Sequence, residues 1–247
     1  MSGPYRLGVD VGGTHTDLVL LNVADGSIEI EKVSSTPANP ALGVLEGVNR
    51  FIAQGKKPDA IEFFAHGTTI TTNALLEMRG AKVGMMITRG YRAIQEIQQQ
   101  ARDGNPFAYF FQRPTPLAPQ SQTFEAGGRI DFEGNELAPL DEDDVRAAAR
   151  SLKAKEVSSI AVVYLFSYMN PSHERRTREI ILEEWPEAHV SLSSDVLPRI
   201  REWARMSTTL LNAYLEPVLV HYIGDLSDGL DDGGVKTQQR FLMQSNG

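Results

Sequence analysis

Short stretches of β-branched and other apolar residues open the chain. Residues 6–11, 16–23 and 28–34 form three such stretches, and glycine-containing turns separate them at Gly12-Gly13 and Asp25-Gly26. This pattern predicts an antiparallel meander of three strands. The Gly-Gly turn between the first two strands is therefore the first place to look for function.

Apolar residues then recur alternately at helical and at strand spacing. Residues 40–54 predict a helix, 61–65 a buried strand, 71–79 a second helix and 83–88 another buried strand. The resulting order, β-β-β-α-β-α-β, predicts one mixed sheet with helical crossovers.

The rest of the chain predicts a second, smaller α/β unit over about residues 125–195. Acidic residues at 140–144 open a helix that runs to 153, where they complement its dipole, so this acidic run is interpreted as a cap and not as a metal site. The other expected elements are a strand at 160–166, a helix at 171–185, a strand at 190–192, a long helix at 201–226 that Pro217 kinks, and a strand at 240–243.

An aromatic, proline-rich segment lies between these regions, at residues 104–119. Long segments of this kind are either surface crossovers, held down by their aromatic rings, or lids that face a substrate or a subunit. The sequence leaves both alternatives open.

Composition narrows the functional classes. The 247 residues are 41% hydrophobic, which suffices for a folded core, and a net charge of -8 argues against nucleic acid or an anionic membrane as the partner. The absence of cysteine excludes disulfides, thiolate zinc sites and cysteine nucleophiles. No apolar run is long enough for a membrane helix or a signal peptide, so we expect a soluble, cytoplasmic protein.

The segment from Asp10 to Asp17 carries the clearest chemistry. Gly12 and Gly13 allow successive backbone N–H groups to face an anion, and Thr14 and Thr16 add hydroxyl donors. Asp10, at the end of the first strand, is suited to hold Mg²⁺ through water or to orient a nucleophile. A Gly-Gly turn is also common in purely structural hairpins, but the acid and the threonines favour a phosphate loop.

A second candidate lies where a strand turns into a helix. Thr68, Thr69 and Thr71 surround this helix start and could bind a phosphate or a carboxylate, although Thr71 could equally be a simple N-cap. His66 is either a buried, satisfied histidine or a base. His173-Glu174 lacks zinc-motif spacing and is predicted to be a pair on a helix surface.

The P-loop and Rossmann fingerprints are both absent from the chain. Instead, the sequence resembles the N-terminal region of the hydantoinase A/5-oxoprolinase family, which includes ATP-dependent N-methylhydantoinases and related ketone carboxylase subunits. The resemblance rests on blocks in family order at residues 7–17, 66–73, 88–91, 140–145, 170–175, 191–195, 211–214 and 243–247.

The resemblance implies the N-terminal lobe of the actin-like ATPase fold, which is ribonuclease H-like: an α/β lobe with a mixed five-stranded sheet plus the smaller α/β unit. It implies an N-terminal family domain over residues 1–200, with the insertion at about 125–195, and the start of the core domain at 201–247. Family members are longer, so we expect a truncated chain that cannot complete a catalytic cycle alone.

The resemblance also implies ATP and Mg²⁺ as cofactors. Gly12, Gly13, Thr14, His15, Thr16 and Thr69 would bind ATP, Asp10 would be catalytic and bind the metal, and Thr68 would be catalytic. The family usually has an aromatic residue where this chain has His15. The implied reaction is ATP-dependent opening of a cyclic amide of the hydantoin or 5-oxoproline type, with a hydantoinase B-type subunit as the partner.

Three alternatives remain open. The first is an ATP-dependent ketone carboxylase subunit. The second is half of a sugar or acetate kinase, which the later blocks disfavour. The third is a non-catalytic module that docks a larger complex through residues 104–119.

Overall fold

The computed structural model describes residues 5–36, 39–98, 110 and 114–243. Its chain forms two compact units, one built from residues 1–79 and 218–247 and the other from residues 80–217. The chain crosses between them twice, the second time within one long helix. Most of the aromatic segment at 104–119 lies outside the described residues, and its role stays a prediction.

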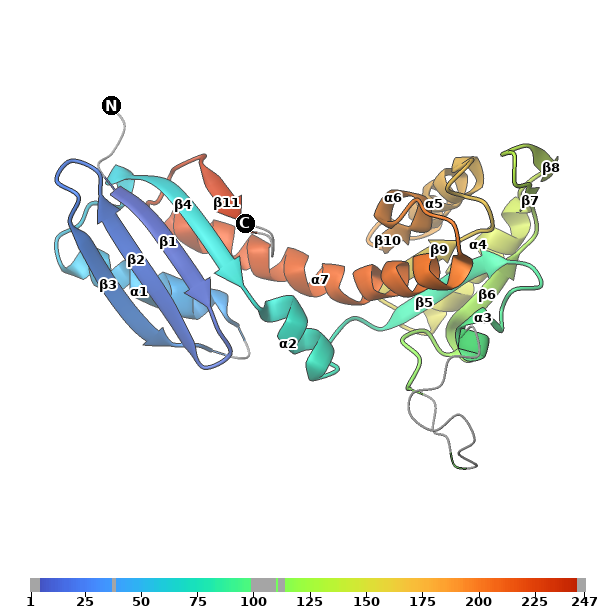
Figure 1. The fold of residues 1–247 in the computed structure, drawn as a ribbon, viewed down its shortest axis with the longest axis horizontal. Helices are drawn as coiled ribbons and strands as arrows, with labels where there is room; N and C mark the ends of the chain where they lie inside the picture. The colour runs from blue at the N-terminus through green and yellow to red at the C-terminus, as the bar shows by residue number, and fades with distance from the viewer. Residues whose placement is uncertain (1–4, 37–38, 99–109, 111–113, 244–247) are drawn as a thin grey trace. The chain divides into compact units, whose positions relative to one another are not determined.

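A five-stranded mixed sheet forms the first unit (Figure 1), in the order β11-β4-β1-β2-β3. Strand β2 pairs antiparallel with both β1 and β3, whereas β4 pairs in parallel with both β1 and β11. The predicted meander and mixed five-stranded sheet are thereby confirmed. The strands are β1 Tyr5–Val11, β2 His15–Asn22, β3 Ile28–Ser34, β4 Ile61–Thr68 and β11 Arg240–Leu242.

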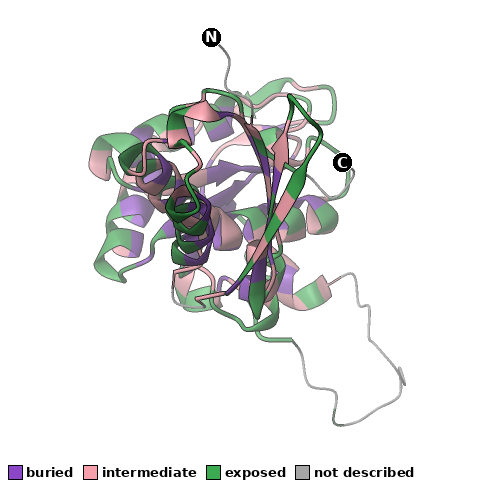
Figure 2. Ribbon diagram, turned by 90° about the vertical axis from the view of Figure 1, so that its left-hand side faces the viewer, coloured by how far each residue is buried: buried purple, intermediate pink, exposed green. Residues whose placement is uncertain are grey.

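Helices cover one face of this sheet. They are α1 Ala41–Ala53 and the C-terminal part of α7 Glu202–Asp232, whereas the short helices η1 Pro58–Ala60 and α2 Ile70–Leu76 precede and follow β4. Buried residues alternate with intermediate or exposed ones along β1 and β2, and Figure 2 colours the ribbon by this burial, as expected for a half-buried sheet. Helix α1 approaches closely, since a Cβ at Gly47 would lie 2.2 Å from a methyl carbon of Leu18.

The second unit holds a parallel four-stranded sheet, in the order β10-β9-β5-β6, and a two-stranded antiparallel pair. Its strands are β5 Val83–Thr88, β6 Thr123–Ala126, β7 Arg129–Ile130, β8 Glu136–Ala138, β9 Ser159–Val163 and β10 His189–Leu192. Its helices are α3 Ile94–Ile97, η3 Gln120–Gln122, α4 Glu142–Ala154, α5 Ser172–Glu184, α6 Ser193–Val196 and the N-terminal part of α7.

The strand at 83–88 belongs to this second sheet, so its predicted place in the first sheet is wrong. All six of its residues are buried, because it lies between β6 and β9 and is covered on both faces. The fifth strand of the first sheet comes instead from Arg240–Leu242, which pairs with β4. The sequence pattern predicts a strand at 240–243, but it contains no signal that this strand pairs with β4, which is far away in the sequence.

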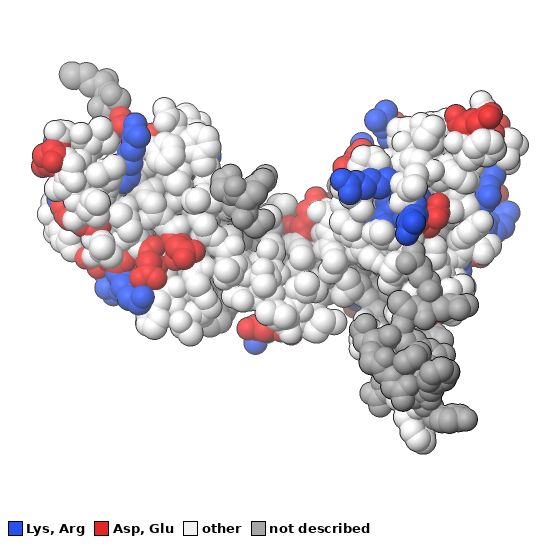
Figure 3. Space-filling view, viewed as in Figure 1, with Lys and Arg blue, Asp and Glu red and all other residues white. Residues whose placement is uncertain are grey.

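Charged side chains stabilise the surface of the second unit. The acidic run caps α4 as predicted, since the Asp141 side chain accepts a hydrogen bond from the backbone of Asp144. Salt bridges then join α4 to α5, among them Arg150 to Glu184 at 2.8 Å. Acidic and basic side chains lie side by side on the visible surface (Figure 3).

The His173-Glu174 pair is buried, so its predicted place on a helix surface is wrong. Glu174 is fully buried, and its carboxylate accepts hydrogen bonds from the Tyr164 backbone, the Ser193 hydroxyl and the Ser194 backbone. Arg205, also fully buried, donates to the same Ser193 hydroxyl. Helix α5 carries many charged residues, which made its whole sequence look solvent-exposed. Its buried face includes Glu174, Thr177 and Ile181, and their i, i+3, i+7 spacing indicates that face.

Across the described ranges of the chain, no helix combines the length and the apolar character needed to cross a membrane.

Candidate phosphate-binding site

The turn between β1 and β2 is tightly built. The Gly12 N–H donates to the His15 carbonyl at 3.0 Å, and the Ser35 N–H donates to the Thr14 carbonyl at 3.0 Å. Neither Gly12 nor Gly13 has a positive φ. Glycine provides space at position 12, where a Cβ would lie only 3.1 Å from the His15 carbonyl oxygen, whereas a Cβ at Gly13 would make an ordinary contact with the Asn73 amide at 3.5 Å.

Two backbone N–H groups of this turn are available to a ligand. Within the part of the chain that the structure describes, the N–H groups of Gly13 and Thr14 donate to no protein acceptor. Both residues are exposed. Consecutive unpaired N–H groups in a turn form a concavity suited to an anion such as a phosphate group.

Thr16 occupies a different position from its neighbours. It is fully buried, and its hydroxyl lies 3.0 Å from that of Ser35, which in turn donates to the Gly12 carbonyl at 2.8 Å. Thr16 and Ser35 therefore hold the turn from the core side. The alternation along β2 carries this information, since Thr16 shares its face with Leu18 and Leu20. Sequence reasoning did not identify Ser35.

The second motif lies directly beside the first. In the parallel pairing of β1 with β4, Asp10 is opposite Gly67 and Val11 is opposite Thr68. A Cβ at Gly67 would lie 3.5 Å from Asp10 Oδ1, so the carboxylate lies over this glycine. The fold thus brings Asp10, the Gly-Gly turn and the end of β4 together.

Thr69 closes the wall of the site. Its N–H and its hydroxyl both donate to the Val11 carbonyl, at 3.3 and 3.4 Å, and its hydroxyl accepts a hydrogen bond from the Asn73 amide at 3.4 Å. The Thr68 hydroxyl accepts from the Ile70 N–H at 3.1 Å. Asn73 is a further polar group of the site, present in the second motif but not chosen as a site residue.

Helix α2 begins at Ile70, with Thr69 as the residue that precedes it. Thr71 therefore lies inside the first turn, and its interpretation as an N-cap is wrong.

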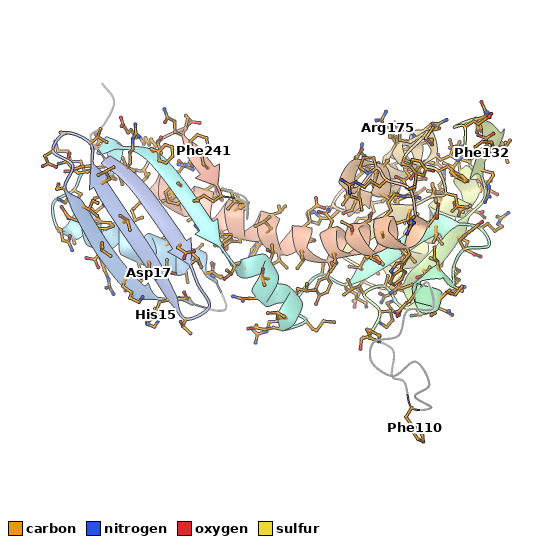
Figure 4. The ribbon with its side chains drawn as sticks, in the orientation of Figure 1. His15, Asp17, Phe110, Phe132, Arg175 and Phe241 are labelled. Carbon is orange, nitrogen blue, oxygen red and sulfur yellow. The ribbon has the colours of Figure 1, made fainter. Side chains whose placement is uncertain are left out.

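Two charged or titratable residues of the motif face solvent on β2. His15 is exposed, and its Nδ1 lies 3.1 Å from the Thr14 hydroxyl. Asp17 forms a salt bridge of 2.9 Å with Lys32 on the neighbouring strand. Both lie near the turn at the end of the sheet (Figure 4), where His15 can contact a ligand bound to the turn.

His66 is buried beneath this site, with 2% of its surface exposed. Its Nε2 lies 2.6 Å from the Tyr222 hydroxyl, while its Nδ1 has no hydrogen-bond partner among the residues that the structure describes. Burial lowers the pKa of His66 to about 4, although the nearby Val9 carbonyl and the Asp10 carboxylate oppose the shift. His66 is therefore neutral at physiological pH and has no solvent-facing role as a base.

The arrangement fits Mg²⁺ carried by a nucleotide better than a metal held by protein ligands alone. Among the described residues, no cluster of three histidine, aspartate or glutamate side chains could hold a metal ion. Asp10 offers a single exposed carboxylate beside the turn. Mg²⁺ in nucleotide sites is commonly bound through one or two carboxylates together with phosphate oxygens and water.

Comparison with known proteins identifies relatives of the whole chain. Residues 6–185 match the model of the family described as the hydantoinase/oxoprolinase N-terminal region. The chain is 35% identical to the caprolactamase subunit alpha of Pseudomonas jessenii over 98% of its own length, which is 36% of that relative.

Solved structures give the same result. The crystal structure of the ATP-dependent caprolactamase from Pseudomonas jessenii superposes with a TM-score of 0.86 at 34% identity, over 98% of this chain and 36% of that one. The nucleotide-free structure of acetone carboxylase superposes with a TM-score of 0.81 at 30% identity, over 96% and 35%. The chain thus spans little more than a third of the length of these relatives.

Proposed function

Because the chain belongs to the hydantoinase/oxoprolinase N-terminal family, we propose that it supplies the first phosphate-binding loop of an ATP-dependent amidohydrolase. One observation carries the proposal. The unpaired N–H groups of Gly13 and Thr14 lie in a turn beside the exposed carboxylate of Asp10. Donors for an anion next to one carboxylate are what a magnesium–phosphate group requires.

Each residue of the turn has a separate task in this proposal. The Gly13 and Thr14 N–H groups bind phosphate oxygens, and Gly12 keeps the turn narrow. Thr69 and Thr68 form the neighbouring wall. Asp10 would hold Mg²⁺, which supplies charge neutralisation at the phosphates, and positioning of this kind dominates phosphoryl-transfer catalysis.

The substrate in this proposal is a cyclic amide of the hydantoin or 5-oxoproline type. A neutral amide is a poor electrophile with a poor leaving group, so coupling its opening to ATP makes chemical sense. The name of the related caprolactamase, an ATP-dependent enzyme, supports this class. The same relative is named as a subunit, which supports assembly with a second subunit. In the proposal this partner is of the hydantoinase B type, and the complex is cytoplasmic.

The domain division belongs to the same proposal. A family domain over residues 1–200 would be followed by the start of a core domain at 201–247, and the second phosphate loop would come from a further lobe.

A ketone carboxylase subunit is the second candidate. The similarity to acetone carboxylase, with a TM-score of 0.81, favours it almost as strongly as the caprolactamase structure favours an amidohydrolase. Both reactions would use the same phosphate loop, so the loop does not discriminate between them.

Calorimetric titration with Mg·ATP tests the phosphate loop. We expect binding by the wild-type protein and a loss of binding in the Asp10→Ala and Gly13→Val variants. Phosphate release is then measured, in a protein that also contains the proposed further lobe, with two substrate panels: cyclic amides alone, and ketones with bicarbonate. Stimulation by cyclic amides supports the amidohydrolase, stimulation by ketones supports the carboxylase, and wild-type binding that both variants retain would overturn the assigned site.

A further inference from the structure

A buried polar contact joins helix α7 to the strand that carries the wall of the site. Tyr222 of α7 and His66 of β4 are 4% and 2% exposed, and the Tyr222 hydroxyl lies 2.6 Å from His66 Nε2. The two rings pack with their centroids 5.5 Å apart. Because both side chains are buried, neither residue can contact a ligand or solvent directly.

Packing alone does not explain it either. The surroundings are apolar, with Phe64 and Val9 of the same core beside the pair. His66 Nδ1 is buried without a hydrogen-bond partner among the described residues. Apolar side chains of similar size would fill this space without an unsatisfied polar atom, so the retained contact calls for another explanation.

The position of His66 along β4 supplies that explanation. His66 is opposite Val9 in the sheet, the next residue faces Asp10, and Thr68 faces Val11. On its other side, the His66 carbonyl accepts a hydrogen bond from the Met243 N–H at 2.8 Å. A contact that holds the His66 side chain therefore restrains the strand that continues directly into Gly67 and Thr68.

We propose that the Tyr222–His66 hydrogen bond is a positioning contact, which fixes the Gly67–Thr69 wall relative to Asp10 and the phosphate-binding turn. The inference rests on the proposed function for its effect on ATP. The positioning of residues 67–69 by this contact does not depend on any ligand.

Tyr222→Phe is the central test, because it removes one hydroxyl and keeps the ring. Tyr164→Phe is the matched control: Tyr164 is equally buried, its hydroxyl also makes one side-chain hydrogen bond, to Thr177 at 3.1 Å, and it belongs to the second unit. Both variants lose one buried hydrogen bond, so their urea midpoints should fall by similar amounts.

Two measurements on the full chain separate positioning from stability. The first is hydrogen–deuterium exchange without nucleotide, in which Tyr222→Phe should speed exchange at residues 67–69 and Tyr164→Phe should not. The second is Mg·ATP affinity, which Tyr222→Phe should weaken roughly five- to tenfold while Tyr164→Phe stays within about twofold of wild type. His66→Gln, whose amide can still meet the Tyr222 hydroxyl, should retain more affinity than His66→Leu.

The outcomes distinguish the two proposals. If hydrogen–deuterium exchange at residues 67–69 is unchanged in Tyr222→Phe, the positioning role is overturned, whatever the Mg·ATP affinity of the variant. Equal ATP affinities in the Tyr222→Phe and Tyr164→Phe variants of a protein that binds ATP overturn its relevance to the site. Faster exchange in a protein whose wild type does not bind ATP leaves the positioning contact in place and overturns the proposed function.

Discussion

Asp10 and Gly67 lie against each other across the β1–β4 pairing, close enough that a Cβ at residue 67 would be 3.5 Å from Asp10 Oδ1. The contact joins two motifs that are far apart in the sequence. It places the carboxylate of Asp10 next to the end of a second strand, where a magnesium–phosphate group can be approached from two sides.

In a complete enzyme that also contains the proposed further lobe, Asp10→Ala should abolish ATP-coupled turnover while the fold is retained. Asp10 is exposed, so its loss removes no core contact, but the charge that balances Mg²⁺ disappears. We expect at least a roughly 100-fold lower rate of phosphate release, by analogy with the loss of one preorganised electrostatic group. Asp59→Ala, at an exposed position in the same unit, is the control and should match wild type.

Gly13→Val should weaken Mg·ATP binding with little effect on stability. The added side chain meets only the Asn73 amide at an ordinary contact distance, and the backbone of Gly13 has no positive φ to strain. The branched side chain would, however, cover the N–H groups that face the phosphate. Calorimetry should show a loss of affinity of about tenfold or more. A variant that binds ATP like wild type would show that the phosphate lies elsewhere.

Two helical glycines should respond oppositely to alanine. Gly47→Ala forces a Cβ to within 2.2 Å of Leu18 and should lower the free energy of unfolding by roughly 1–3 kcal/mol through overpacking. Gly224→Ala adds a Cβ into open space on α7 and should raise it by roughly 0.5–1 kcal/mol through backbone entropy. Urea unfolding measures both. Equal changes in the two variants would contradict the close packing of α1 on the sheet.

His66 should make stability depend on pH between about 6.5 and 4. Its pKa is lowered to about 4 in the folded state, so the unfolded chain takes up the proton first as the pH falls. The contribution of neutral His66 is complete above pH 6.5 and is lost towards pH 4, by an amount on the order of 3 kcal/mol. Urea unfolding of wild type and of His66→Gln at several pH values isolates this term. Parallel pH profiles for the two proteins would contradict it.

The sequence predicts local elements of this fold better than their partners. The three strands of the meander are joined by short turns, so their pairing follows from proximity. Strand β5 has no such neighbour, and a continuous apolar run is compatible with the centre of any buried sheet. Its assignment to the second sheet depends on partners in β6 and β9 that only the complete fold brings together.

The candidate site was predictable to a similar extent. Residue type and spacing identify Asp10, the Gly-Gly turn and the threonines after β4, because that chemistry is local. The direction of Thr16 and His66 towards the core follows from strand alternation, which motif reading ignores. The contact of His66 with Tyr222 joins residues 156 positions apart, and no local pattern indicates it.

The pairing of β11 with β4 also constrains the order in which the parts of the protein can fold during synthesis. Strands β1 to β4 leave the ribosome early, yet the edge of their sheet beside β4 stays open until residues 240–242 have been synthesised. The second unit is one continuous segment, residues 80–217, and can complete its own sheet before then. The nascent chain therefore exposes an unpaired strand edge during translation, and such edges are prone to aggregation and are common targets of chaperones.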